Sequence, residues 1–321
     1  MNYTINNSQP NLNSWIKENI NEPPFTQSFE WTEILKNENK IVERLAILDN
    51  NKIIATTLVE YREFFLGLKY AFCPLGPVYS SEADQEKILN DLSEYFKNKK
   101  CVFFRIENQT ELSQNILHTK TRNLNPRATI KINLAQTQEK ILKQMHSKTR
   151  YNIGLAERKN LTIKTEKNLP IFIELMKKTG ARDGFRPHPQ NHYKNILNSP
   201  FAHQITIYKN DIPLATGIFI GFGEVFTYLF GASDHSYRNL MAPYLLQWTA
   251  IKMGQNFGNR FYDFFGIAPT SADANHQYSA ITRFKIGFGG KYFETSGTFD
   301  IIINHKKYFF YKVLRKIKSL V

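Results

Sequence analysis

The sequence predicts an α+β protein built from two domains of the same architecture, each a mixed sheet with flanking helices. Its 321 residues are about twice the length of a typical domain of roughly 150 residues. One order of elements, strand–turn–strand–strand–helix–strand, occurs twice along the chain. The composition, 42% hydrophobic and 22% charged, is that of a globular protein and excludes bulk disorder and coiled-coil rods.

The first copy of this order occupies the N-terminal third of the chain. Runs of alternating apolar and polar residues predict strands, and Asp49-Asn50-Asn51 between two of them predicts a turn. A Pro/Gly cluster at 74–77 ends the third strand, and Ser81 opens a pattern of apolar residues at helical spacing. The expected strands are 43–48, 53–61, 70–73 and 101–106.

The second copy follows about 160 residues later, which is close to one domain length. Its turn is Lys209-Asn210-Asp211, and Pro243 suits the first position of its helix, which runs through Met253. The two copies share few identical residues, so the order of elements is what indicates an internal duplication. The expected strands are 203–208, 214–222, 225–230 and 261–265.

A helix-rich segment separates the two copies. Apolar residues at helical spacing predict one continuous helix over 138–159, with the basic residues Lys140, Lys143 and Arg150 in a neighbouring stripe. Two shorter helices are expected at 171–179 and 190–197. The end of the chain, 308–321, is predicted to be a basic amphipathic helix or tail.

The chain has a large positive charge, which points to polyanionic partners. Its formal net charge is +14. Residues 140–167 carry eight basic and two acidic residues, a net of +6, and residues 296–321 carry six basic residues and one acid, a net of +5. Such a surplus favours nucleic acid, nucleotide phosphates or an anionic membrane face, although a charge run is often only a solvated face.

Several classes of protein and site are excluded or disfavoured. No apolar run approaches 18 residues and residues 1–10 show no signal-peptide pattern, so a cytoplasmic protein is expected. Cys73 and Cys101 lie in apolar stretches typical of buried free thiols. His188 and His192 have metal-binding spacing but no acidic neighbour, so no metal is expected. The sequence has no P-loop, strand-linked GxGxxG or GxSxG motif.

Each repeated module resembles the acyltransferase fold of the GNAT superfamily. In that superfamily a Gly-rich turn at a helix start holds the pyrophosphate of acetyl-CoA through its backbone amides. The equivalent stretch here, 237–243, has Met241 where the glycine would fall and Pro243, which has no amide hydrogen. The resemblance therefore implies that the acetyl-CoA loop is lost, and no cofactor is expected.

A set of local motifs, taken in order, resembles the FemABX family of peptidoglycan-bridge aminoacyltransferases. The N-terminal part of the resemblance is carried by Gln27, Ser28, Trp31 and Lys36. Each motif is weak alone, and the ordered set spans nearly the whole chain. The remaining motifs are 147–153 (SKTRYNI), 185–187 (FRP), 231–233 (GAS), 242–248 (APYLLQW), 262–267 (YDFFGI) and 284–290 (FKIGFGG).

The resemblance implies an enzyme that transfers an amino acid from aminoacyl-tRNA to the stem-peptide amine of a peptidoglycan precursor. The long helical hairpin of many members is missing, so the sequence resembles the shorter members. The resemblance leaves open whether the acceptor is UDP-MurNAc-pentapeptide or lipid II. The family fold implies a GNAT-like domain of residues 1–125 plus 296–321, on the precursor side, and a second of residues 126–295, on the tRNA side. A monomer with peripheral contact to the inner membrane face is expected. The alternatives are a FemAB-like N-acyltransferase using acyl-CoA on a sugar or lipid precursor, and a non-catalytic nucleic-acid-binding protein.

The resemblance also implies roles for individual residues. Lys285, in a Gly-flanked turn where the backbone approaches a ligand closely, is the expected catalytic cation near the ester oxyanion; the alternative is a surface lysine. Lys36 and Arg186 match family positions that bind the acceptor's diphosphate. The alternative for each is a cation in an ordinary surface ion pair. Glu107 is either the acceptor of the amine's proton or a strand-end carboxylate paired near Arg105.

The remaining candidates complete the expected site. Tyr228 and Tyr244 either line the peptide cleft or belong to the core. Phe284 is expected beside the substrate, and Asp263 ends a strand at the same place, with a structural role. The basic residues Lys140, Lys143 and Arg150 are expected to contact tRNA phosphates.

Overall fold

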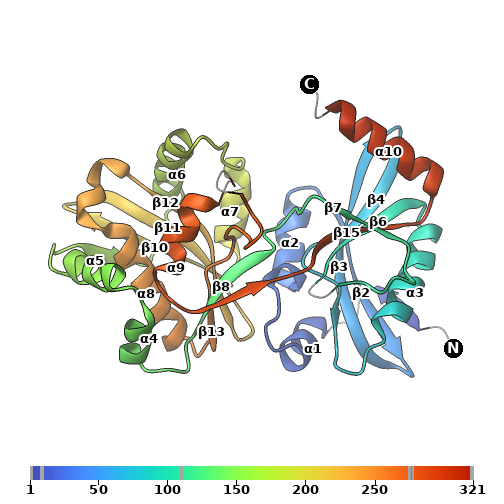
Figure 1. The fold of residues 1–321 in the computed structure, drawn as a ribbon, viewed down its shortest axis with the longest axis horizontal. Helices are drawn as coiled ribbons and strands as arrows, with labels where there is room; N and C mark the ends of the chain where they lie inside the picture. Colours follow the sequence, from blue (N-terminus) through green and yellow to red (C-terminus); the bar gives the residue numbers. More distant parts are fainter. Residues whose placement is uncertain (1–2, 8–10, 109–110, 274–275, 277, 319–321) are drawn as a thin grey trace. The chain divides into compact units, whose positions relative to one another are not determined.

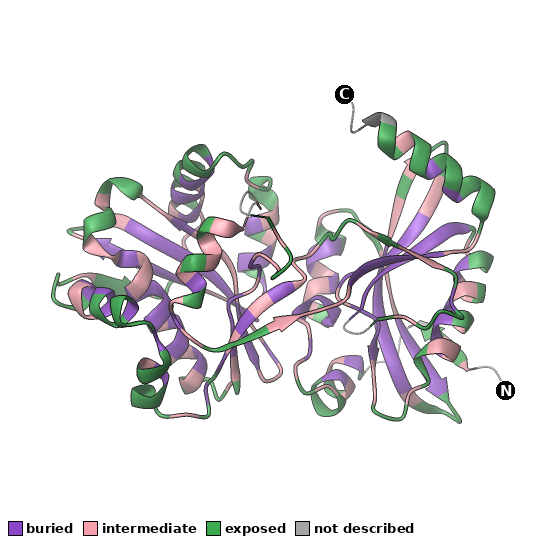
Figure 2. Ribbon diagram, in the orientation of Figure 1, coloured by how far each residue is buried: buried purple, intermediate pink, exposed green. Residues whose placement is uncertain are grey.

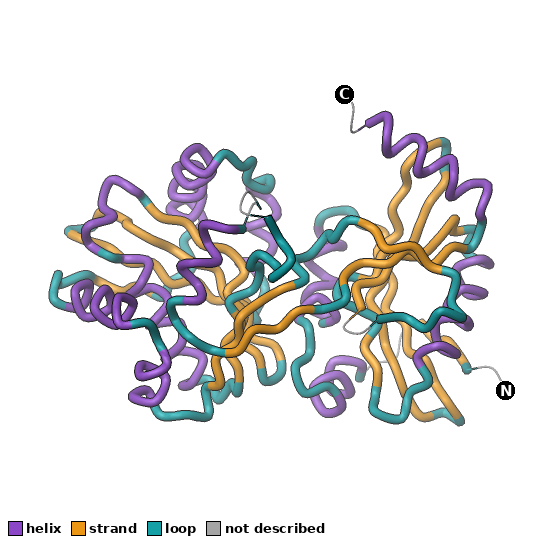
Figure 3. The backbone as a smooth tube through the Cα atoms, in the orientation of Figure 1, coloured by secondary structure: helices purple, strands orange, loops and turns teal. Residues whose placement is uncertain are grey.

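A computed structural model describes the chain except residues 1–2, 8–10, 109–110, 274–275, 277 and 319–321. The chain divides into two compact units. Unit 1 contains residues 1–127 and 295–321, and unit 2 contains residues 128–294. Figure 3 shows that each unit combines its own sheet with flanking helices. In the part of the chain described here, no helix is both long and apolar enough to cross a membrane.

Unit 1 is built on an eight-stranded sheet in the order β1-β2-β3-β4-β6-β15-β7, with β5 paired to β3. The C-terminal strand β15 therefore returns to the N-terminal unit and lies between β6 and β7. Its strands are β1 (Thr4–Asn7), β2 (Ile41–Asp49), β3 (Lys52–Phe65), β4 (Leu68–Cys73), β5 (Val78–Tyr79), β6 (Cys101–Asn108), β7 (His118–Thr121) and β15 (Gly297–Ile302).

Unit 2 is built on a seven-stranded sheet in the order β14-β8-β13-β12-β11-β10-β9. Central strands of both sheets are largely buried, as Figure 2 shows. The strands of unit 2 are β8 (Ala128–Asn133), β9 (Thr162–Lys164), β10 (Ala202–Lys209), β11 (Ile212–Phe222), β12 (Val225–Ser233), β13 (Phe261–Asp263) and β14 (Lys291–Glu294).

The two sheets repeat one pattern of strand directions. In unit 1, β2, β3 and β4 are successively antiparallel and β6 is parallel to β4. In unit 2, β10, β11 and β12 are antiparallel and β13 is parallel to β12. One helix precedes the parallel strand in each case, α3 (Gln85–Asn98) in unit 1 and α8 (Ala242–Asn256) in unit 2. This confirms the expected repeat of architecture and the α+β fold class.

The first hairpin of each unit has the same turn chemistry. Asn50 and Asn51 have φ of 47° and 64°, and Asn210 and Asp211 have φ of 47° and 62°. Asn and Asp tolerate the left-handed conformation that a two-residue hairpin turn requires. Both strand pairs also shift register close to the turn. The sequence identified both turns because this requirement is local.

Most helices begin at residues that suit a helix start. Ser28 accepts a hydrogen bond from the amide of Trp31, and Pro243 occupies the first turn of α8, as expected. The remaining helices are α1 (Leu12–Asn19), α2 (Phe29–Asn37), α4 (Gln138–Gln144), α5 (Ser147–Glu157), α6 (Leu169–Asp183), α7 (Gln190–Asn198), α9 (Ser279–Ile286) and α10 (His305–Lys318), with 3-10 turns at Phe25–Gln27 and His235–Leu240.

The prediction of one continuous helix over 138–159 is wrong. The chain leaves the helical conformation at Met145 and His146, which have ψ of 151° and 143°. The amide of His146 donates to the carbonyl of Gly287 at 2.9 Å, so it is not available to a helix that continues through this point. The side chain of Met145 is buried in the core of unit 2, which holds the break in place.

The C-terminal helix α10 lies across the sheet of unit 1 next to β4 and β6 (Figure 1). The predicted basic helix began at Tyr308, and α10 begins three residues earlier, at His305. Residues 319–321 of the prediction lie outside the described residues. The helix packs through Tyr308 and Tyr311 against Tyr70, Phe72 and Phe103.

Candidate functional site

Lys285 lies in α9 and is buried, with only 6% of its surface exposed. The expectation of a Gly-flanked turn is therefore wrong: the helix runs through Lys285 and the glycines follow it. The ammonium donates hydrogen bonds to the carbonyls of Phe265 and Gly266, the latter at 2.8 Å. Among the described residues no carboxylate forms an ion pair with it. The alternative of an ordinary surface lysine does not fit this burial.

The surroundings of Lys285 make its charged form costly. Burial lowers the pKa of Lys285 from 10.5 to about 7, and the nearby carboxylate of Asp263 only partly opposes this. Asp263 itself accepts from Thr129 Oγ1 at 2.5 Å and from the amide of Phe265 at 2.7 Å. Its other oxygen lies 3.9 Å from Lys131 Nζ. Asp263 is thus held by other partners, and Lys285 changes protonation state near neutral pH.

The glycines after Lys285 serve close packing within the protein. A Cβ on Gly289 would lie 2.6 Å from the carbonyl oxygen of Gln144, and one on Gly290 would lie 2.6 Å from that of Lys131. Both have positive φ, of 75° and 93°. The expected close approach is therefore to the protein's own backbone. It fixes the segment after α9 against α4 and β8.

The aromatic candidates of unit 2 gather around Lys285 and its neighbour Phe284. Lys285 Nζ lies 5.4 Å from the centre of the Tyr228 ring. Phe284 packs edge-on against Tyr244, with ring centres 5.1 Å apart. These rings also pack against the core of unit 2. Tyr228 and Tyr244 therefore pack as the alternative of core residues predicts. The structure thus brings Lys285, Phe284, Tyr228, Tyr244 and Asp263 into one region.

Gln247 is a buried polar residue of this region to which the sequence assigned no role. It lies in α8, is 1% exposed, and accepts a hydrogen bond from Tyr262 Oη at 2.5 Å. Burial raises the pKa of Tyr228, and a hydrogen bond with Gln247 lowers it by less. The sequence signal for this role is a glutamine among the apolar residues of 242–248. A buried amide needs hydrogen-bond partners, so its position predicts a buried polar contact.

The start of α8 keeps the backbone shape of a glycine turn without the glycine. Met241 has φ of 54°, the left-handed conformation that glycine adopts most easily. Its side chain packs against the core of unit 2. The helix then begins with Ala242 and Pro243, and the proline offers no amide hydrogen to an anion. The helix terminus therefore has one donor fewer for a pyrophosphate than a glycine-rich turn.

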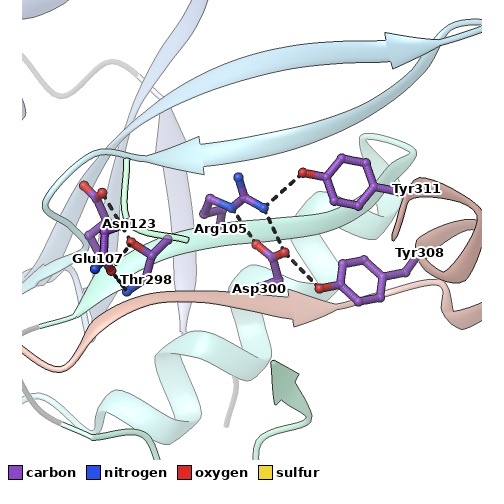
Figure 4. A network of polar contacts seen from close by, with 7 residues as sticks. All are labelled: Arg105, Glu107, Asn123, Thr298, Asp300, Tyr308 and Tyr311. Carbon is purple, nitrogen blue, oxygen red and sulfur yellow. Dashed lines mark hydrogen bonds and ion pairs between the residues drawn. The ribbon is translucent and has the colours of Figure 1, made fainter. Parts of the chain in front are cut away.

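Glu107, near the end of β6 in unit 1, is buried and lies beside Thr298 (Figure 4). Its carboxylate accepts from the amide of Leu75 at 2.9 Å, and from the amide and the Nδ2 of Asn125 at 2.8 and 2.7 Å. Arg105, two residues earlier, pairs with Asp300 and not with Glu107. These contacts favour a structural strand-end carboxylate, and a role for Glu107 in proton transfer stays a prediction.

The two cations expected to hold a diphosphate have different surroundings. Lys36, on α2 in unit 1, pairs with Glu33 at 2.8 Å, which is the surface ion pair that was the alternative for this residue. Arg186 is exposed in the loop after α6 in unit 2, and it makes no hydrogen bond or ion pair within the described residues. Phe185 and Pro187 on either side of it pack closely against Gly180 of α6. The loop therefore presents Arg186 from a fixed backbone.

The expected tRNA-binding residues lie on two helices. Lys140 and Lys143 are exposed on α4, and Arg150 is exposed on α5. The Arg150 guanidinium donates to the carbonyl of Met145 at the break between the helices. Arg150 therefore has a structural contact, and the two lysines remain as exposed cations.

The fold defines the class of protein. A tandem GNAT protein from the clavulanic acid biosynthesis pathway matches with a TM-score of 0.56 at 9% identity, over 94% of this chain and 99% of that chain. The solved structure "Crystal structure of FemX" matches with a TM-score of 0.83 at 18% identity, over 95% of this chain and 98% of that chain. The chain has a tandem GNAT-like fold.

The sequence comparisons identify the family. The FemAB family matches residues 8–120, 114–207 and 198–316, and the chain belongs to this family. Aminoacyltransferase FemA of Staphylococcus epidermidis is 22% identical over a match that covers 84% of this chain and 89% of that protein. Lipid II:glycine glycyltransferase of Staphylococcus haemolyticus is 22% identical over a match that covers 72% of this chain and 75% of that protein.

Proposed function

We propose that the protein transfers an amino acid from aminoacyl-tRNA to the stem-peptide amine of a peptidoglycan precursor, either UDP-MurNAc-pentapeptide or lipid II. The relatives FemA and lipid II:glycine glycyltransferase support the class of reaction. The observation that carries the proposal is Lys285, a buried ammonium in a family motif with a pKa of about 7 and only backbone carbonyls as hydrogen-bond partners.

The reaction requires an amine to attack an ester carbonyl, and negative charge then develops on the carbonyl oxygen. A cation held in place before the reaction stabilises that charge without reorganisation. Lys285 supplies such a cation, and its pKa of about 7 means that a large fraction is protonated at neutral pH. In its neutral form the same amine can accept a proton from the attacking nucleophile.

The acceptor's diphosphate is assigned to Arg186, and Lys36 of unit 1 stays a separate candidate. Arg186 supports this assignment because it is an exposed guanidinium without a protein partner in the described residues, held on a tightly packed loop. Arg186→Ala should raise the apparent KM for the peptidoglycan precursor more than that for aminoacyl-tRNA. Exposed Lys194→Ala is the matched control. A KM increase confined to tRNA would assign Arg186 to the other substrate.

The donor is assigned to the basic segment 140–167. Contacts to tRNA phosphates release counterions, so the affinity should fall steeply with salt. Because Arg150 is tied to Met145, the sharper variant is Lys140→Glu combined with Lys143→Glu. It should weaken tRNA binding in a filter-binding assay at low salt by about tenfold or more, since it reverses two charges. Unchanged affinity would remove this segment from the tRNA site.

The decisive experiment offers the enzyme both donors. The protein is incubated with UDP-linked pentapeptide and either a mixed aminoacyl-tRNA pool or acyl-CoA, and the acceptor is weighed by mass spectrometry. The proposal expects an added aminoacyl mass only with charged tRNA. Transfer from acyl-CoA alone would establish the alternative N-acyltransferase, which the missing amide at Pro243 and the side chain at Met241 disfavour. Uncharged tRNA and Lys285→Met are the controls.

A further inference from the structure

The outer face of α10 and the neighbouring β3–β4 turn expose an apolar surface in unit 1. The residues that share this exposure belong to two segments of the same unit, and together they are called the α10 patch. Figure 2 shows most of α10 as exposed. The α10 patch consists of Phe65 (42% exposed), Leu66 (86%), Phe309 (70%), Phe310 (39%) and Val313 (39%).

The inner face of α10 is held firmly, so its outer face has a fixed orientation on unit 1. Tyr308 Oη donates to Asp300 at 2.9 Å, and Arg105 donates to Tyr311 Oη at 3.1 Å (Figure 4). The rings of Tyr311 and Phe103 lie 4.7 Å apart. Helices of globular proteins usually bury one apolar stripe and expose a polar one. This helix buries its tyrosines and exposes a second apolar stripe.

The second stripe follows helical spacing. Phe309 and Val313 are four residues apart and therefore neighbours on one face of α10, about opposite Tyr308 and Tyr311. Phe310 extends the stripe toward the β3–β4 turn and packs against Phe65, with ring centres 5.5 Å apart. The stripe and the turn thus form one continuous surface.

Leu66 at the tip of the turn is the most exposed residue of the α10 patch. Its φ is 45°, a left-handed conformation that is unfavourable for leucine. Within the described residues, no core packing offsets this conformation, because the side chain stays 86% exposed. Leu66 therefore adds to a contiguous exposed apolar patch, which is typical of a surface that binds a protein or a membrane.

Cations surround the apolar residues. Helix α10 contains no acidic residue. On β3, Glu63 adds one exposed acid, and it stands opposite Lys69 of β4. The exposed cations of α10 are Lys306, Lys307, Lys312, Arg315 and Lys316.

From this combination we infer that the α10 patch binds the surface of a bilayer that contains anionic lipids. A helix with apolar residues on one side and flanking lysines lies in the plane of such an interface, with its apolar side among the acyl chains. The cations add attraction to anionic headgroups. A helix of 14 residues is too short to span the bilayer. A nucleic acid would use the charges but not Leu66 and Phe309, and a second copy would bring like charges together.

The inference is tested by sedimentation of the full chain with phosphatidylcholine vesicles, with and without phosphatidylglycerol. The protein should sediment with the anionic vesicles and stay free with the neutral ones. Leu66→Ser combined with Phe309→Ser should lower the partition coefficient about tenfold or more, because two apolar side chains no longer enter the interface. Lys306→Glu combined with Lys312→Glu should lower it by a similar factor.

Matched controls separate the patch from general surface properties. Phe29→Ser combined with Ile41→Ser removes two apolar side chains of the same unit that are 51% and 65% exposed, outside the patch. Lys177→Glu combined with Lys194→Glu makes the same change of net charge in unit 2. Both controls should bind within about twofold of the wild type. The melting temperatures of all variants are compared, because a change there would show loss of folding instead of loss of binding.

Three results would overturn the inference. One is a wild-type protein that does not sediment with anionic vesicles. Another is normal vesicle binding by the Leu66→Ser/Phe309→Ser variant, with loss only in the charge variant, which would leave a purely electrostatic polyanion site. The third is a lower solution mass of the patch variants than of the wild type when no vesicles are present. It would show that a second copy of the chain covers the patch in the wild type. Transfer to the soluble UDP-linked acceptor is assayed separately, so failure of the proposed reaction would not affect this result.

Discussion

Each unit contains a buried cation, and the two are held in opposite ways. Arg105 in unit 1 is 2% exposed and makes a bidentate pair with Asp300, at 2.6 and 2.9 Å. Burial alone would lower the pKa of Arg105, and the hydrogen bonds with Asp300 raise it overall. Lys285 in unit 2 is 6% exposed and has only carbonyl partners, and burial lowers its pKa to about 7.

The difference separates a charge that its partner fixes from a charge that can exchange a proton. Arg105 stays charged at every accessible pH because its guanidinium donates hydrogen bonds to the carboxylate of Asp300 and to Tyr311 Oη. It can therefore tie β6 to β15 and α10, but it cannot exchange protons. Among the described residues Lys285 has no paired carboxylate, and it changes charge near neutral pH, which suits the role proposed for it in acyl transfer. Four predictions test this comparison.

The largest effect is expected when the charge pair of unit 1 is broken. Asp300→Asn leaves the Arg105 guanidinium buried without its carboxylate, which should lower the free energy of unfolding by about 3–5 kcal/mol. Urea unfolding measures this. The control is Arg105→Met combined with Asp300→Leu, which removes both charges and should cost less. A loss below about 1 kcal/mol for Asp300→Asn would show that the pair does not hold unit 1 together.

A loss of activity is expected when the unpaired cation of unit 2 is removed. Lys285→Met keeps most of the side chain's length but cannot stabilise a developing oxyanion, so kcat should fall about 100- to 1,000-fold. Steady-state kinetics with saturating aminoacyl-tRNA measures this, and the KM for the precursor should change little. Exposed Lys291→Met is the matched control. If single-turnover chemistry of Lys285→Met equals that of the wild type once tRNA is bound, Lys285 only positions the tRNA end.

The pH dependence of stability should also distinguish Lys285 from Arg105. Between pH 7 and 10.5 the unfolded chain binds a proton at Lys285 that the folded chain does not. The free energy of unfolding therefore rises with pH across this window, by up to about 1.4 kcal/mol per pH unit. Below pH 7 Lys285 is protonated in both states, so the full cost of burying its charge lowers the stability of the folded chain there. Lys285→Met should lose this rise, measured by urea unfolding at several pH values. An unchanged slope would mean that Lys285 keeps its ordinary pKa.

The smallest effect is expected at the exposed pair of Lys36 and Glu33. Their side chains are 53% and 42% exposed, so water screens the attraction at 2.8 Å. Glu33→Gln should change the free energy of unfolding by less than about 0.5 kcal/mol. If Lys36 binds the acceptor's diphosphate, this variant should keep or improve the precursor KM, because it frees the ammonium. A large loss of stability would contradict the contrast between exposed and buried pairs.

The sequence by itself determined the elements of the repeated modules and their order. Strand alternation, the Asn and Asp residues of the two hairpin turns and Pro243 at the start of α8 act within a few residues, so their effect can be read locally. The ordered motifs also led to the correct family. These signals predicted both copies of the repeated architecture, because each copy needs the same local chemistry.

Only the tertiary structure decided which distant residues meet. Arg105 and Asp300 are 195 residues apart in sequence and meet because β15 returns beside β6. The helix break at His146 depends on the carbonyl of Gly287. The sequence predicted Lys285 in a Gly-flanked turn. Its place inside α9 puts its ammonium beside the carbonyls of Phe265 and Gly266 and the ring of Tyr228. Periodicity shows which side of an element is apolar, but the neighbour that covers that side, and therefore the pKa of any charge there, is set by packing between segments far apart in the chain.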